Sequence, residues 1–388
     1  MFNQNWPSFT LKEIFRVRRV LSSNKVNYWT GNECKDFEAN FSDWTKAKYS
    51  IALSNGTVAL ELALKSFNLS ERDEVIVTPR SFIASVSSII MNNAKPIFAD
   101  IDLKSGNISP ESIERKITPN TKGIICVHMA GWPCEMDKIM RISSSHNLFV
   151  IEDCAQAHGA KINDKSVGTI GDIGAWSFCQ DKIMTTGGEG GMITTNNKKL
   201  WDLIWSYKDH GKTIESVYNK NHPKGFRWQH DRFGTNSRMT EMQAAIGNVQ
   251  LTYMNNWHKL RKRNALIFHE AFNDLDAINS YLPDQNYEHG WYKFYAYLNL
   301  NALRADYNRE KIIDKINSKN IFCQTGGCSE IYLEKAFKNK DYKPKKRLKN
   351  AKKLTDTSLM FLIHPTISKK KILQNANQVR KIIINATR

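Results

Sequence analysis

A single lysine stands in an apolar segment beside a cluster of glycines. The segment reads WSFCQDKIMTTGGEGGM and covers residues 176–192. A lysine that is shielded from water has a lowered pKa, and its neutral amine can form a Schiff base with a carbonyl compound. Trp176, Phe178 and Ile183 would provide the shielding for Lys182. The alternative for a lone lysine is a solvated position on the surface.

An aspartate precedes this lysine at a suggestive spacing. Asp153 closes the strand-like run LFVIEDCAQA (148–157), and Lys182 follows 29 residues later, after a second strand-like run at 174–178. Parallel strands end at the same edge of a sheet, and α/β proteins bind their ligands at that edge. Asp153 and Lys182 could therefore lie at adjacent strand ends. The alternative for Asp153 is a cap at the start of a helix over CAQAHGA.

A third segment could bind a phosphate group. In LSNGTVALELALKSF (53–67), a strand end is followed by Asn55, Gly56 and Thr57 and then by a helical pattern. The free N–H groups at a helix N-terminus bind phosphate well, although an ordinary helix cap explains the same residues. Pyridoxal phosphate requires an amine for its Schiff base, a carboxylate for its pyridine nitrogen and an anchor for its phosphate. The three segments together predict this cofactor.

The elements that must position these residues alternate along the first part of the chain. Strands are predicted at 73–79, 95–102, 122–131, 148–157 and 174–178, and helices at 81–94, 109–117 and 134–147. This alternation predicts a mostly parallel, doubly wound α/β sheet. At the N-terminus, Thr10 and Glu13 have the pattern of a capping box.

The pattern changes after residue 239. A long helical stretch, either straight or bent, runs to residue 272, and a strand at 292–300 and an amphipathic helix at 309–320 follow it. We therefore predict a large cofactor-binding domain over residues 1–250 and a smaller C-terminal α+β domain over 251–388.

Composition limits the remaining possibilities. The chain has 388 residues and a formal net charge of +18, which favours anionic partners such as phosphorylated metabolites. The densest basic run, at 334–353, is either a solvated face or part of a phosphate-binding surface. No nucleic-acid-binding motif is present, and the spacing of the seven cysteines indicates reduced thiols and no metal site. Without a signal peptide or a membrane span, the expected location is the cytoplasm.

Four ordered motifs resemble one known family. SNGTVALELAL, VIEDCAQAHGA, GDIGAWSF with Lys182 and TTGGEGGM, and NSRMTEMQAAIGNVQL together are similar to the DegT/StrS family of pyridoxal-phosphate-dependent sugar aminotransferases. The resemblance extends from about Trp29 to Leu251. It implies the type I aminotransferase fold and a homodimer with active sites at the subunit interface.

The resemblance also implies roles for individual residues. Lys182 matches the Schiff-base lysine, Asp153 the partner of the pyridine nitrogen, and Gln156 the neighbour of the phenolic oxygen. The other positions that match cofactor-binding residues are Gly56, Thr57 and Ser177 at the phosphate, Phe82 on the ring, and Asn236, which reaches the phosphate from the partner subunit. Trp29, Glu189 and His210 are expected near the substrate, and Glu189 would either position the substrate or brace its loop.

The expected reaction is transfer of an amino group from L-glutamate to a keto sugar nucleotide, for the biosynthesis of amino sugars and surface polysaccharides. The GEGG form of the glycine run resembles members that act at C-4, so a 4-keto-6-deoxy sugar is the predicted acceptor. The extra glycine and the FLIHPTIS segment (361–368) depart from the family pattern and leave the substrate geometry open. The alternatives are a keto-cyclitol as acceptor, or a regulatory protein without turnover, which the intact Lys182 and Asp153 disfavour.

Overall fold

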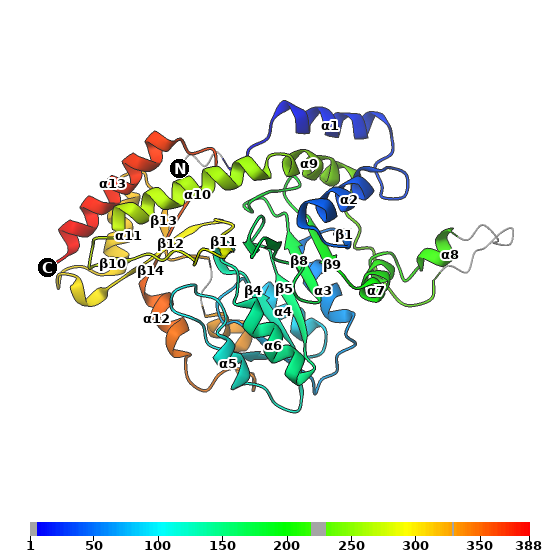
Figure 1. Ribbon diagram of the computed structural model, residues 1–388, viewed down its shortest axis with the longest axis horizontal. Helices are drawn as coiled ribbons and strands as arrows, with labels where there is room; N and C mark the ends of the chain where they lie inside the picture. Colours follow the sequence, from blue (N-terminus) through cyan, green and yellow to red (C-terminus); the bar gives the residue numbers. More distant parts are fainter. Residues whose placement is uncertain (1–5, 219–229, 328–329) are drawn as a thin grey trace.

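The largest element of the structure is a seven-stranded sheet (Figure 1). The computed structural model of the chain describes residues 6–218, 230–327 and 330–388. Neighbouring strands of this sheet are parallel except on both sides of β9, which confirms the predicted mostly parallel sheet. In spatial order the strands are β1 (Tyr49–Leu53), β9 (Gly191–Thr195), β8 (Ile173–Ser177), β5 (Phe149–Asp153), β4 (Thr121–Val127), β2 (Glu74–Val77) and β3 (Lys95–Phe98).

Helices cover both faces of the sheet because its strands carry apolar side chains in both directions. Adjacent residues of a strand point to opposite faces, so Ile124 and Ile125 of β4 belong to different hydrophobic clusters. On one face pack α3 (Gly56–Lys65), α4 (Ala84–Met91) and α7 (Lys198–Lys208). On the other face pack α2 (Glu33–Thr45), α5 (Pro110–Glu114), α6 (Met136–His146) and α9 (Glu241–Leu251).

The predicted strands are found, but several end earlier than their apolar runs. The run at 95–102 leaves the sheet after Phe98, the run at 122–131 after Val127, and the run at 148–157 after Asp153. Each predicted helix between them is also present, shortened at its ends. The chain leaves the sheet at the points where polar groups such as His128 and Asp153 form hydrogen bonds outside the strand ladder.

The helical stretch predicted at 239–272 consists of two helices. These are α9 and α10 (Met254–Phe272), and they meet at Thr252 and Tyr253. The Thr252 hydroxyl donates a hydrogen bond to the carbonyl oxygen of Val249 at 2.7 Å, and the Thr252 N–H bonds to the same residue. Such local bonds compete with the regular helical pattern and mark the break.

The C-terminal residues form a second sheet with its own apolar core. The strand predicted at 292–300 is β12, and the helix predicted at 309–320 is α11. The core lies between this sheet and helices α10, α11 and α13. The domain boundary at residue 250 stays a prediction. The elements are β10 (Ile278–Asn279), β12 (Phe294–Leu298), β14 (Ser358–Phe361), β13 (Cys323–Gln324), α11 (Arg309–Asn317), α12 (Lys349–Thr357) and α13 (Lys369–Ala386).

Smaller elements complete the described part of the chain. A three-stranded sheet consists of β11 (Tyr287–Glu288), β6 (Lys161–Ile162) and β7 (Lys165–Ser166). Helix α1 (Leu11–Ser22) begins with the capping box predicted at Thr10 and Glu13, and α8 (Ile214–Tyr218) follows α7. None of the described helices is long and apolar enough to cross a membrane. The described cysteines are free thiols, and Cys328 lies outside the described residues. The cytoplasmic location of the protein stays a prediction.

One side chain joins α9 to the start of α2, and both helices contribute to the hydrophobic cluster that contains Trp176 of β8. The N-cap residue of α2, Asn32, makes no capping bond with its own side chain. Instead, the buried carboxylate of Glu241 accepts hydrogen bonds from the N–H groups of Glu33 at 2.6 Å and Cys34 at 3.2 Å. A negative group at this position satisfies N–H groups that the helix itself leaves free and interacts favourably with the helix dipole.

Replacing this carboxylate should therefore destabilise the fold. We expect Glu241→Ala to lower the free energy of unfolding by about 2–4 kcal/mol, because two N–H groups lose a charged acceptor in a buried place. Glu241→Gln keeps one acceptor oxygen and should cost roughly half as much. Urea titration measures both values. Glu114→Ala, which removes an exposed glutamate, is the control, and equal stability of this control and Glu241→Ala would contradict the capping role.

Candidate active site

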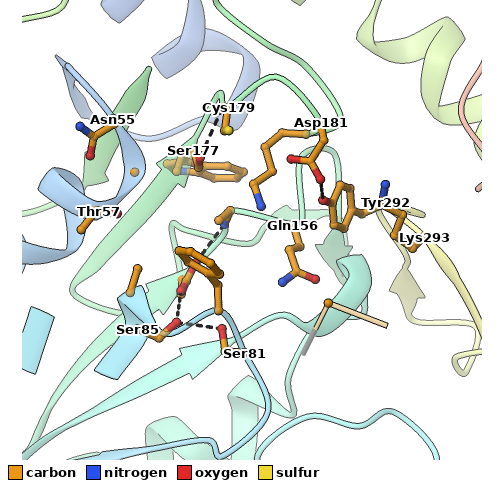
Figure 2. Close-up of a pocket in the computed structure, with 18 of the residues that line it drawn as sticks. Asn55, Thr57, Ser81, Ser85, Gln156, Ser177, Cys179, Asp181, Tyr292 and Lys293 are labelled. Carbon is orange, nitrogen blue, oxygen red and sulfur yellow. Dashed lines mark hydrogen bonds between the residues drawn. The ribbon is translucent and has the colours of Figure 1, made fainter. Parts of the chain in front are cut away.

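A cavity of about 870 Å³ lies at the carboxyl ends of β5 and β8, beside the N-terminus of α3 (Figure 2). The topology explains its place, because parallel neighbours bring these strand ends to the same edge of the sheet. The sequence-predicted residues that line the cavity are Gly56, Thr57, Phe82, Asp153, Gln156, Ser177, Lys182 and Glu189.

Asp153 is a buried carboxylate in the floor of the cavity. It is 4% exposed, and it accepts hydrogen bonds from the Ser85 hydroxyl at 2.7 Å and from the N–H of Ala155 at 3.1 Å. No ion pair joins it to another of the described residues. Residues 154–160 form turns, so Asp153 does not cap a helix. A buried carboxylate with two neutral donors fits a cationic ligand group that the protein itself does not supply.

Glu152, the neighbour of Asp153, is committed to the protein structure. It points to the opposite face of the sheet, as expected for adjacent residues of a strand. Its carboxylate accepts bonds from the N–H groups of Gly168 and Gly171, at 2.8 Å and 2.7 Å, and lies 3.0 Å from the ring of His128. Burial alone would raise its pKa, but His128 and these N–H groups hold the pKa below its usual value.

The N-terminus of α3, where the sequence predicts a phosphate site, forms one corner of the cavity. The Asn55 side chain accepts a bond from the N–H of Val58, which orders the first turn. A Cβ atom on Gly56 would lie 2.5 Å from the Cβ of Ser177, so this close approach of α3 to the end of β8 requires glycine. Gly56, Thr57 and Ser177 thus meet at one corner of the cavity. N–H groups at a helix start and a nearby hydroxyl are a suitable set of donors for phosphate.

A glycine of the 187–191 cluster also permits a close contact. A Cβ atom on Gly191 would lie 2.3 Å from the carbonyl oxygen of Asn55. Strand β9 therefore passes directly beside the loop that starts α3, and a side chain at this position would separate the two. The glycine cluster next to the lysine segment is explained in part by this packing against the predicted phosphate loop.

Lys182 lies in the segment between β8 and β9, which has no helix or strand of its own. Its backbone N–H donates to the carbonyl oxygen of Cys179 at 3.0 Å, and its carbonyl accepts from the indole of Trp6 at 2.8 Å. The amine lies over the ring of Tyr292, 5.1 Å from its centroid. The side chain is half-buried and lines the cavity, so Lys182 is not the solvated surface lysine of the alternative interpretation.

Three further residues line the cavity near Lys182. Figure 2 shows Asp181 and Tyr292 facing each other, and the Tyr292 hydroxyl donates to the Asp181 carboxylate. The amine of Lys293 lies 4.6 Å from the centroid of the Tyr292 ring. Burial lowers the pKa of Lys293 to about 8, with smaller effects from Asp181, Arg261 and Lys182.

Sequence reasoning missed these three residues and Ser85. Tyr292 and Lys293 follow Lys182 by more than 100 residues and belong to none of the four motifs. Asp181 is adjacent to the lysine, and this adjacency was the one available signal. The contact of Ser85 with Asp153 depends on how α4 packs on the sheet, which no local pattern gives.

Three predicted residues do not line the cavity in the described part of the chain. Asn236 is exposed and pairs with Asp209 through a backbone bridge. Trp29 packs edge-on against Trp205 at 5.9 Å, and His210 is exposed with a φ of +57°. Their expected roles at the cofactor or the substrate stay predictions.

The chain is similar to known proteins. The chain matches the model of the DegT/DnrJ/EryC1/StrS aminotransferase family over residues 8–380. It is 42% identical to a GDP-perosamine synthase of Escherichia coli O157:H7 over 278 residues, which are 72% of this chain and 73% of that protein. It is 35% identical to a UDP-N-acetyl-3-dehydro-alpha-D-glucosamine 3-aminotransferase of Acidithiobacillus ferrooxidans, over 75% of this chain and 76% of that protein.

A solved structure gives the same result for the fold. The aminotransferase of Psychrobacter cryohalolentis is 51% identical and superimposes with a TM-score of 0.96, with 98% of each chain covered. The predicted aminotransferase fold is therefore confirmed. This chain belongs to the DegT/DnrJ/EryC1/StrS aminotransferase family, whose enzymes use pyridoxal phosphate as their cofactor.

Proposed function

We propose that this aminotransferase transfers an amino group from L-glutamate to a keto sugar nucleotide, with a 4-keto-6-deoxy sugar as the acceptor. The observation that carries the proposal is one cavity that combines Lys182, Asp153 and the N-terminus of α3, in a chain 42% identical to a GDP-perosamine synthase. The names of the GDP-perosamine synthase and of the UDP-sugar 3-aminotransferase each refer to a sugar that is linked to a nucleotide. They support a nucleotide-linked acceptor and make C-3 the alternative position. A spore coat polysaccharide biosynthesis protein among the relatives supports a role in surface polysaccharides.

The residues of the cavity fit pyridoxal phosphate. Asp153 would pair with the pyridine nitrogen, because a buried carboxylate favours a cation beside it. The N-terminus of α3 and Ser177 would hold the phosphate. Gln156 would lie near the ring oxygen, with its own side-chain oxygen fixed by the N–H of Ala130 at 2.8 Å. Phe82 is exposed and lines the cavity, as a residue that stacks on the cofactor ring would.

Lys182 would perform the proton transfers. When bound, pyridoxal phosphate supplies an aldehyde carbon that joins to amines and a ring that withdraws electrons from neighbouring atoms. Lys182 would be the residue that binds this carbon before the donor arrives, and its side chain would be a free amine beside the reacting atoms once the donor has taken its place. Its Nζ would move the proton of the glutamate α-carbon to the cofactor's aldehyde carbon, and in the second half-reaction it would move a proton from that carbon to the former ketone carbon of the sugar.

Lys293 is our candidate for binding a carboxylate of the amino donor. Its amine and that of Lys182 lie against the same Tyr292 ring, at 4.6 Å and 5.1 Å from the centroid. The α-carboxylate of glutamate is attached to the carbon whose proton Lys182 removes, so a cation close to Lys182 suits it. The diphosphate of the acceptor is separated from its reacting carbon by much of the sugar ring and would lie further out.

We also propose a homodimer in which each cavity receives a residue from the partner subunit. Asn236 of this chain is exposed and outside its own cavity, which is compatible with a role in a second copy. A cofactor site that is completed by a second subunit would make cofactor affinity depend on protein concentration.

The acceptor is tested with enzyme that has first reacted with L-glutamate and has then been separated from it. We expect a nucleotide-linked 4-keto-6-deoxy sugar to be converted to its amino sugar, measured by mass spectrometry. The free keto sugar should react roughly 100-fold more slowly, because binding of the nucleotide diphosphate orients the ketone. A 3-keto sugar nucleotide and a keto-cyclitol serve as comparison substrates. Equal rates with and without the nucleotide would contradict the proposal. Faster turnover of either comparison substrate would identify that substrate as the acceptor in place of the 4-keto-6-deoxy sugar.

The charge of Asp153 is tested by Asp153→Asn, which keeps the shape of the side chain. We expect turnover to fall about 100-fold or more, which corresponds to roughly 3 kcal/mol of transition-state stabilisation. Ser85→Ala is the matched control, since it removes a neutral donor to Asp153 and keeps the charge; it should cost much less. Near-normal turnover of cofactor-loaded Asp153→Asn would show that the carboxylate has no electrostatic role.

The role of Lys293 predicts a dependence on pH. Because burial lowers its pKa to about 8, its positive charge is present below pH 8 and is lost as the pH rises through 8. The KM for glutamate should therefore rise above pH 8, and Lys293→Arg should move this rise to higher pH because arginine stays protonated. Lys293→Gln should have a high KM at all pH values. A normal glutamate KM in Lys293→Gln would sink the assignment, and a raised KM for the sugar nucleotide alone would assign the lysine to the diphosphate.

A further inference from the structure

The segment that carries Lys182 is positioned by residues far from it in the sequence. Residues 178–190 form turns and bends between β8 and β9, with a single bridge between Cys179 and Gly188, so no helix or longer sheet ladder fixes the backbone at the lysine. A group that moves protons between reacting carbon atoms must be held to within about 0.5 Å of its productive position. The contacts of this segment with the rest of the chain must therefore supply the precision.

The carbonyl of Lys182 is bonded to the N-terminal part of the chain. The indole Nε1 of Trp6 donates a hydrogen bond to this oxygen at 2.8 Å, across 176 residues of sequence. The N–H of Lys182 is bonded to Cys179 on the other side. The lysine backbone is thus held at both its N–H and its C=O, and the second of these bonds comes from outside the sheet and its loops.

Trp6 is itself fixed by side chains from the C-terminal half of the chain. Its ring meets the ring of Trp257 edge-on at 4.9 Å and stacks on His364 at 6.0 Å. The guanidinium of Arg261 lies 4.9 Å from its centroid. Arg261 also donates to the carbonyl of Tyr292 at 3.2 Å, and Tyr292 in turn bonds to Asp181. The indole and the residue before the lysine are therefore held by one connected set of contacts.

A second link joins the N-terminal residues to the lysine segment, through the side chain of Gln250. The side-chain oxygen of buried Gln250 accepts a bond from the N–H of Thr185 at 2.9 Å. Its amide nitrogen donates to the carbonyl of Ser8 at 3.4 Å. The N-terminal residues 6–8 thus contact the lysine segment directly at Lys182 and through Gln250 at Thr185.

We propose that residues 6–8 form an N-terminal brace for the lysine segment, and that Trp6 is a positioning residue for Lys182. Its N–H fixes the peptide plane that follows Lys182 and hence the direction in which the lysine side chain leaves the backbone. The inference rests on the proposed role of Lys182. It adds to the site a residue that lies outside the cavity and 176 positions away in sequence.

The first measurement separates the two proposals. Borohydride reduction of the wild-type holoenzyme and peptide mapping should find the cofactor on Lys182. Attachment to another residue would overturn the proposed function itself, and with it the inference about Trp6. With Lys182 confirmed, any result on Trp6 bears on the brace alone.

Trp6→Phe then removes the indole N–H that bonds to Lys182 and keeps an aromatic ring at position 6. Trp257→Phe alters the same aromatic cluster but leaves the N–H of Trp6 in place. We expect Trp6→Phe to lower kcat about tenfold, the value of one buried hydrogen bond, with little change in the KM for glutamate. The apoenzyme should also bind pyridoxal phosphate more slowly and release it faster, followed by visible absorbance. Trp257→Phe should stay close to the wild type in kcat, in the KM for glutamate and in the rates of cofactor binding and release, while the unfolding temperatures of the two variants should be similar.

Gln250→Met provides the second variant, because it removes the link to Thr185 and Ser8 at similar side-chain volume. It should repeat the pattern of Trp6→Phe, and it takes the place of that variant if Trp6→Phe does not fold. Equal kcat and cofactor release in Trp6→Phe and Trp257→Phe would overturn the positioning role. If neither Trp6→Phe nor Gln250→Met folds, residues 6–8 are needed for the stability of the fold, and this result would also overturn the positioning role.

Discussion

The buried carboxylate of Asp153 is the constraint around which the site is arranged. A charge in the interior is costly unless a partner balances it, and the partners that Asp153 has within the described chain are two neutral donors. The sheet order places it at the end of a central strand, so α4 can supply Ser85 from one side while β8 brings Ser177 from the other. A protonated pyridine ring is a partner of the right charge, and it would join this floor to the phosphate corner at α3.

The antiparallel strand β9 explains how the lysine segment reaches that floor. Because β9 lies between β1 and β8, the chain must turn back after Ser177, and this turn carries Lys182. The register pairs Gly191 with Ser177 on one side and with Leu53 on the other. The segment after β8 and the loop before α3 are therefore adjacent for a topological reason, and the small residue at 191 lets them approach closely.

Local patterns were sufficient for the parts of the site that lie on regular elements. Asp153 at a strand end and Gly56 at a helix start follow from periodicity and capping, and the mostly parallel sheet follows from the alternation of strands and helices. The contacts of Trp6 and Tyr292 with the lysine segment could not be predicted in this way, because each joins residues more than 100 positions apart through tertiary packing. A bend in the helical stretch was allowed for, but its place at Thr252 could not be predicted, since a threonine hydroxyl that bonds back to Val249 leaves the apolar periodicity of the stretch intact.

The cavity has two walls of different origin, and this division bears on what each wall does. The strand ends and α3 carry the residues proposed to bind the cofactor, all before residue 200. The opposite wall comes from the later half of the chain and is largely aromatic and apolar, apart from Lys293 and Gln324; its other residues include Tyr292, Tyr295, Phe322, Met360 and Leu362. Apolar and aromatic surfaces suit the faces of a sugar ring, whereas they give little to a phosphate. Substrate choice should therefore depend mainly on this second wall. Its residue Leu362 belongs to the segment 361–368, which also contains His364, and the ring of His364 stacks on Trp6.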